Sequence, residues 1–186
     1  MVPNDLNVET LIAGIRSDDP ARRTAAWLNA AKVGTAALLP LAQQMETGSA
    51  EVCRAAKNAL WKITRAAGAP GATTRSETVQ GLIPLLQPQR PVAVRREVLW
   101  MLSEIADDTA VGPIAALMSD TELRGDCRMV LQRIPGDASL AALMAAFASS
   151  PEDFKHELAQ ALRDRGVAVD GYPCQKLVPA RQIPTP

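Results

Sequence analysis

The sequence predicts an all-α fold, a right-handed α-solenoid of about five stacked helix pairs. Two observations lead to this prediction. Apolar residues make up 47% of the 186 residues and aromatic residues only 3%, and the helix-favouring residues alanine and leucine dominate the composition. In addition, a segment with helical periodicity recurs along the chain at intervals of about 30 to 40 residues, the range of helical solenoid repeats.

The clearest copy of the recurring segment is Ala93–Ile105, whose apolar residues fall on one helical stripe. Aligned on Glu51–Ile63, it matches Val94 with Val52, Leu102 with Leu60 and Ile105 with Ile63. The remaining copies are Ala21–Leu28, Glu122–Ile134 and Asp153–Leu162. Each copy is therefore expected to form the second helix of a pair.

Shorter helices are expected to precede these segments, at Val8–Ile15, Thr35–Gln44, Val79–Leu86, Thr109–Met118 and Ser139–Ala148. Asp19 before Pro20, and Ser150 before Pro151, each predict the start of a second helix, because a capping side chain precedes a proline. With Asp153, Ser150 has the spacing of a capping box.

Two segments lie outside the repeats. Residues 66–76, rich in Ala, Gly, Pro and Thr, predict a loop insertion between two repeats. Residues 166–186 form an extended C-terminal tail, which leaves a repeat solenoid over residues 1–165. Because a solenoid exposes the apolar face of its last repeat, Val167–Val178 is expected to fold back and cover that face.

The segment Pro91–Ile114 resembles a HEAT repeat, most closely the short bacterial subtype named after phycobilin lyases. It has a proline-started helix with Val94-Arg95, an Asp turn and a short helix containing Val111 and Pro113. The resemblance covers about residues 8–165 and implies that the second helices line the concave face. It also implies a ladder of cations bridging to the acidic turns of neighbouring repeats, interrupted at Cys53, with members Arg22, Arg95, Arg124 and, as a weaker match, Lys155.

A helical projection places all three tryptophans of the chain on the face of the second helices that is not used for the core. Tryptophan and arginine are enriched at interface hot spots, so we predict a non-catalytic scaffold that binds a protein partner there. The opposing interpretation is that these tryptophans fill gaps between adjacent helices. The predicted partner-binding residues are Arg23, Trp27, Arg54, Asn58, Trp61, Arg96, Trp100, Glu104, Met129 and Arg133.

Other partners and compartments are disfavoured. Lysine plus arginine and aspartate plus glutamate both number 20, and this neutral charge argues against a nucleic-acid partner. No stretch approaches the roughly 18 apolar residues of a membrane span, and residues 1–5 lack the features of a signal peptide. The three cysteines are widely spaced, so free thiols in a reducing cytoplasm are expected.

No cofactor, metal site or catalytic residue is expected. His156 is the only histidine, and no cysteine has a partner at metal-ligand spacing. The pairs Asp18-Asp19 and Asp107-Asp108 lie where helix caps are needed, so capping is their predicted role.

Two further functions stay open. Trp100 and Glu104 share a helix face, and alkylpurine DNA glycosylases with HEAT-like repeats are similar in placing a tryptophan and an acid at this spacing. The resemblance to those enzymes implies a basic concave cleft and an aspartate, where this chain is neutral and has glutamate. A bilin-lyase-like subunit is suggested by the repeat subtype alone.

Overall fold

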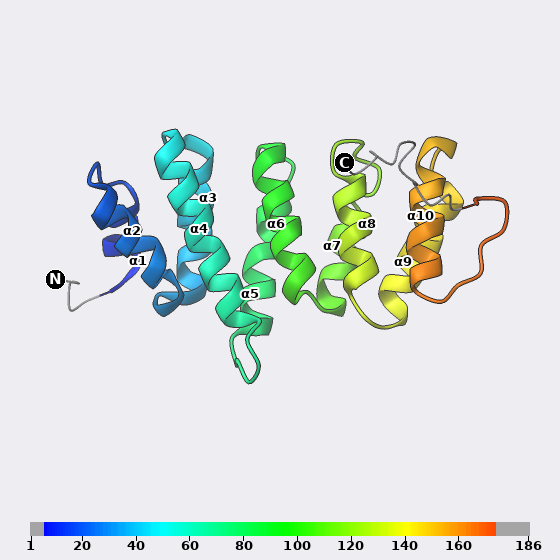
Figure 1. Ribbon diagram of the computed structural model, residues 1–186, viewed down its shortest axis with the longest axis horizontal. Helices are drawn as coiled ribbons and strands as arrows, with labels where there is room; N and C mark the ends of the chain where they lie inside the picture. Colours follow the sequence, from blue (N-terminus) through cyan, green and yellow to red (C-terminus); the bar gives the residue numbers. More distant parts are fainter. Residues whose placement is uncertain (1–5, 174–186) are drawn as a thin grey trace, which may run out of the picture.

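The computed structural model describes residues 6–173 and arranges them as a row of five helix pairs (Figure 1). No strand occurs in this range, so the predicted all-α solenoid is confirmed. The pairs are α1 (Val8–Ile15) with α2 (Pro20–Asn29), α3 (Leu38–Thr47) with α4 (Ala50–Ala67), α5 (Arg75–Leu82) with α6 (Val92–Ile105), α7 (Val111–Ala115) with α8 (Arg124–Arg133), and α9 (Asp137–Ser149) with α10 (Glu152–Asp164).

Four short 3-10 segments complete the connections between helices. They are η1 (Ala30–Lys32), η2 (Gly34–Ala37), η3 (Ile83–Leu86) and η4 (Asp108–Ala110). Among the residues described, no helix combines the length and the apolar character that a membrane crossing requires.

The helices form two layers. The second helices, α2, α4, α6, α8 and α10, lie in front in Figure 1, and each packs against the next one along the row. The first helices form the layer behind them, with contacts between α1 and α3, α3 and α5, and α7 and α9. Leucine, alanine, valine and isoleucine side chains between the layers form one continuous core. Each pair thus buries its apolar face only by stacking on its neighbours.

One of the two predicted helix starts is confirmed. Asp19 caps α2, since its carboxylate accepts a hydrogen bond from the Ala21 amide at 2.9 Å and Pro20 opens the helix. The capping role expected for Ser150 is wrong. Ser150 ends α9 instead, its amide bonded to the Ala146 carbonyl at 2.9 Å, and α10 begins after Pro151 without a side-chain cap. The connection is too short for Ser150 to serve both helices.

The expected insertion is present but shorter than residues 66–76. Helix α4 continues to Ala67 and α5 starts at Arg75, which leaves a loop of residues 68–74. This loop projects from the lower edge of the row in Figure 1, and Gly71 provides its left-handed backbone at φ +79°.

The ladder implied by the resemblance is present at two of its four positions. Arg95 is 6% exposed, and its guanidinium donates to the Leu86 carbonyl at 3.1 Å and to Asp120, in the turn of the next pair, at 3.3 Å. Arg124 repeats this role one pair later, with Asp153 at 2.6 Å. Both contacts join consecutive pairs and fix how one pair sits on the next.

The ladder fails at the ends of the row and is interrupted in the second pair. Arg22 is exposed and has no ion pair within residues 6–173, because Glu51, at the start of the next second helix, bonds to Ser49 instead. Lys155 pairs with Glu152 of its own helix, since no sixth pair follows within the described residues. Cys53, as expected, provides no cation.

The described part of the tail folds back onto the last pair, as expected from the sequence. Val167 and Val169 pack against the core, and the Tyr172 ring meets the rings of Phe147 and His156 edge-on, both at 5.2 Å between centroids. Leu177 and Val178, which were expected to share in this contact, lie outside the described residues.

We predict that Arg95→Ala lowers the free energy of unfolding by about 3 kcal/mol, because a buried cation that holds two repeats together is lost. Chemical denaturation followed by circular dichroism measures the change. The matched control is Arg22→Ala, at the equivalent position of the first pair but exposed and unpaired, with an expected loss under about 0.5 kcal/mol. Equal losses for the two variants would contradict the structural role of Arg95.

Candidate functional site

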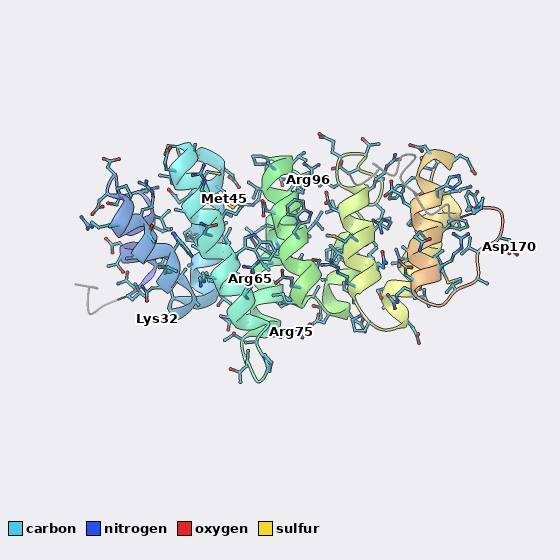
Figure 2. All side chains as sticks on the ribbon, in the orientation of Figure 1. Lys32, Met45, Arg65, Arg75, Arg96 and Asp170 are labelled. Carbon is cyan, nitrogen blue, oxygen red and sulfur yellow. The ribbon has the colours of Figure 1, made fainter. Side chains whose placement is uncertain are left out.

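The predicted partner-binding residues all lie on the second helices. We call the side of α2, α4, α6, α8 and α10 that faces the viewer in Figure 1 the second-helix face. Figure 2 shows Arg65 of α4 and Arg96 of α6 on this face. Its polar contacts cross from one second helix to the next, so the face is organised by the junctions between repeats.

The junction between α4 and α6 is built around the carboxylate of Glu97. Lys57 donates to one oxygen at 3.1 Å and the indole Nε1 of Trp61 donates to the other, also at 3.1 Å. The Glu97 side chain is only 15% exposed, so these bonds are shielded from water. Arg65 stacks on the open side of the same indole, its Cζ 4.8 Å from the ring centroid.

The junction between α6 and α8 repeats this arrangement around Asp126. Arg96 Nε lies 3.0 Å from one oxygen and Trp100 Nε1 donates to the other at 2.8 Å. Arg96 also donates to the Glu122 carbonyl at 2.7 Å. We call this arrangement a carboxylate clasp: a cation and a tryptophan four residues later, both bonded to one carboxylate of the next second helix.

The clasps show what the tryptophans do. Their indole N–H groups are used inside the protein, which agrees with the gap-filling interpretation. The Trp100 ring is nevertheless accessible, at 41% exposed, whereas Trp61 is half-buried, packs against the core and lies under Arg65. Both tryptophans are therefore held in place by bonds to the next helix, and Trp100 presents more of its surface to solvent than Trp61 does.

The junction between α2 and α4 lacks a clasp. Arg23 donates to the Ser17 carbonyl of its own pair at 2.5 Å, and the Trp27 N–H has no acceptor within residues 6–173. Asn58 follows Lys57 directly, as Glu97 follows Arg96, so an amide occupies the position of the clasp carboxylate. Lys62 of α4 lies over the Trp27 ring at 5.8 Å.

The junction between α8 and α10 is different again. Met129 and Gly125 stand where the earlier helices have tryptophan and a cation, and the carboxylate of Glu157 meets Arg128 at 3.5 Å. Met129 is half-buried, and Arg133 donates to Ser103 of α6 at 3.0 Å. Here the face is held by ordinary polar contacts.

Trp100 and Glu104 share a face of α6 but are engaged on opposite sides. Trp100 is bonded to Asp126 of α8, whereas Glu104 lies 3.8 Å from Arg65 of α4. The two prominent cavities lie elsewhere. One of about 420 Å³ is between α1 and α2, and the other of about 410 Å³ is between α7 and α9.

Two of the three cysteines lie in the described residues, and both are free thiols. Cys127 is buried, and its loss of solvation raises the pKa of the thiol to about 12. Cys53 is half-buried on α4. Among residues 6–173, no three His, Cys, Asp or Glu side chains gather as metal ligands would.

The comparisons with known proteins identify no family for this chain. No family model matches, and no curated protein matches at a significant level. Solved structures similar to this chain include an engineered protein, with 21% sequence identity and a TM-score of 0.46. The alignment covers 84% of this chain and 78% of the engineered protein. A designed armadillo repeat protein, in complex with the peptide (KR)4, has 18% sequence identity and a TM-score of 0.48. That alignment covers 83% of this chain and 80% of the designed protein.

The clasp partners Lys57, Glu97 and Asp126 were absent from the predicted set. The sequence holds a signal for the donors but not for the carboxylates: a cation precedes each tryptophan by four residues, in the pairs Arg23 and Trp27, Lys57 and Trp61, and Arg96 and Trp100. The spacing puts both donors on one helix face.

We predict that Glu97→Ala lowers the free energy of unfolding by about 1–2 kcal/mol, because two shielded donors lose their acceptor. Urea denaturation measures the loss. The double variant with Trp61→Phe should lose less free energy of unfolding than the two single variants lose together, because both changes remove the same hydrogen bond. The control is Glu104→Ala, whose long and exposed ion pair should be worth less than about 0.5 kcal/mol. Losses that simply add in the double variant would show that Glu97 and Trp61 are not energetically coupled.

We also predict a difference in thiol reactivity, tested in a Cys174→Ser background. At pH 8 the Cys53 thiol should react with a disulfide reagent, whereas Cys127 should react only on unfolding, because its raised pKa and burial keep it a thiol. Absorbance of the released thiolate, with and without denaturant, counts the reactive groups. Two equivalents without denaturant would contradict the prediction.

Proposed function

We propose that this protein is a non-catalytic repeat scaffold that binds a protein partner through its second-helix face. The observation that carries the proposal is the pair of carboxylate clasps, which hold Trp61 and Trp100 in place while leaving Trp100 exposed and Trp61 half-buried. Side chains that are already ordered lose little entropy on binding, so such a surface suits a protein interface. Aromatic and arginine side chains are also those that dominate interface energetics.

We further assign the row to the short HEAT subtype and place the protein in the cytoplasm. The cations Arg95 and Arg124, each bonded to a carboxylate of the next pair, support the subtype. The free thiols of Cys53 and Cys127 support a reducing compartment.

A protein partner is favoured over a nucleic acid or a glycosylase-type reaction. Helix α10 carries four acidic residues against two lysines and arginines, and this net negative charge at one end of the row disfavours a phosphate backbone along the face. The Trp100 N–H is already taken by Asp126, and Glu104 lies beside Arg65. These contacts direct both side chains toward neighbouring helices.

The test is affinity capture from a lysate of the source organism with immobilised wild-type protein and with Trp61→Ala and Trp100→Ala variants. We expect at least one protein to be enriched on the wild type and reduced about tenfold or more on the variants, the loss typical of an aromatic hot spot. Quantitative mass spectrometry of the eluates measures it, and circular dichroism verifies that each variant keeps its helices.

Gln43→Glu serves as the control, because Gln43 is exposed on α3 in the opposite layer. It should capture the same protein as the wild type. Identical capture by all four proteins, or recovery of nucleic acid in place of protein, would overturn the proposal.

A further inference from the structure

The junction between α2 and α4, the first of the row, contains an incomplete clasp. The second and third junctions each contain a carboxylate, Glu97 or Asp126, that accepts an indole N–H. In the first junction Asn58 takes that position and Trp27 has no acceptor within residues 6–173. The first junction therefore has the indole donor of a clasp but no carboxylate to accept its hydrogen bond.

The same two helices carry an excess of positive charge. Helices α2 and α4 hold six lysines and arginines, two on α2 and four on α4, against one acidic residue, Glu51. In the part of the chain that the structure describes, Arg54 and Lys62 are exposed and form no ion pair. The excess is local, because the whole chain has a formal net charge of zero.

The two unpaired cations lie along one stripe of α4, with Asn58 between them and Arg65, which is 67% exposed and lies 3.8 Å from Glu104, at its end. Arg54, Asn58, Lys62 and Arg65 follow one another at spacings of three or four residues, so they share a helix face. At about 1.5 Å per residue the stripe is roughly 16 Å long. An extended peptide of about five residues has the same length. Trp27 lies beside the middle of the stripe, under Lys62.

From these observations we infer that the stripe of α4 together with Trp27 binds a short acidic segment of a protein partner. One carboxylate of that segment takes the place at the Trp27 N–H that Glu97 and Asp126 take in the other two junctions. Further acidic residues of the segment meet Arg54, Lys62 and Arg65. The inference rests on the proposed function and names the chemistry of the partner.

An acidic peptide fits this surface better than a nucleic acid does. Among the described residues of α4 and α6, the two cations without an ion pair, Arg54 and Lys62, both lie on α4, whereas Arg95 and Arg96 of α6 are paired with Asp120 and Asp126. A nucleic-acid strand would need positive charge beyond the stripe. A carboxylate also has the planar geometry that the existing clasps accept.

The test is fluorescence anisotropy with a labelled peptide of alternating glutamate and glycine, and with the same peptide carrying glutamine in place of glutamate. We expect the glutamate peptide to bind the wild type and the glutamine peptide to bind at least tenfold more weakly. Asn58→Asp should weaken binding about tenfold, because it supplies the missing carboxylate from within. Trp27→Phe, which removes only the N–H, and Lys62→Ala should each weaken it several-fold.

The control is Lys32→Ala, which removes one positive charge from η1 at the lower edge of the row in Figure 2 and should leave the affinity unchanged. Asn58→Asp should in addition raise the melting temperature, since the first clasp would then be complete. Equal binding of the two peptides, an unchanged affinity of Asn58→Asp, or tighter binding of a single-stranded oligonucleotide than of the glutamate peptide overturns the inference.

The two proposals fail in different ways. If a captured partner depends on Trp100 but binds Asn58→Asp as it binds the wild type, the acidic-segment inference is wrong and the scaffold function stands. If capture of no partner depends on Trp61 or Trp100, the proposed scaffold function is wrong, whether or not the glutamate peptide binds.

Discussion

The stacking of one helix pair on the next is the constraint on which the structure depends. Most of the helices have 8–14 residues, a length at which an isolated helix is marginal in water, and each pair has apolar surface on both sides. Apolar packing alone would allow neighbouring pairs to slide. Arg95 with Asp120, Arg124 with Asp153 and the two clasps oppose such sliding, because each joins groups that meet in one register only.

The same interactions create the surface available for binding. A carboxylate that binds a lysine or arginine and an indole N–H from the preceding helix fixes the tryptophan ring at the junction, where part of the residue stays exposed. The structural role of Trp61 and Trp100 in the clasps is therefore compatible with the binding role that we propose for them. At the first junction no carboxylate accepts the Trp27 N–H, and Arg54 and Lys62 of α4 have no ion pair among the described residues.

Local features of the chain were sufficient to predict the fold. Helix α1 has the predicted bounds, and Asp19 caps α2, because both depend on neighbours within a few residues. The failure at Ser150 is also local, since two helix ends compete for one short connection. The site was less accessible to prediction. Aligning apolar residues matched Trp100 with Asn58, whereas the hydrogen bonds make Trp61 its counterpart.

That mismatch has a physical origin. The apolar stripe of a helix repeats every three or four residues, so two repeats can be aligned equally well at registers that differ by one turn. Only the partners of the polar groups, 26 to 40 residues away in the clasps, distinguish the registers. The distribution of charge was likewise not visible in the total. The formal net charge of the chain is zero, although α2 and α4 carry six cations and α10 carries four acids. A solenoid keeps such differences apart along its length, because each pair contacts only its neighbours. The acidic-segment proposal uses this asymmetry, because the net positive charge of α2 and α4 at one end and the net negative charge of α10 at the other would favour one position of an acidic peptide along the row.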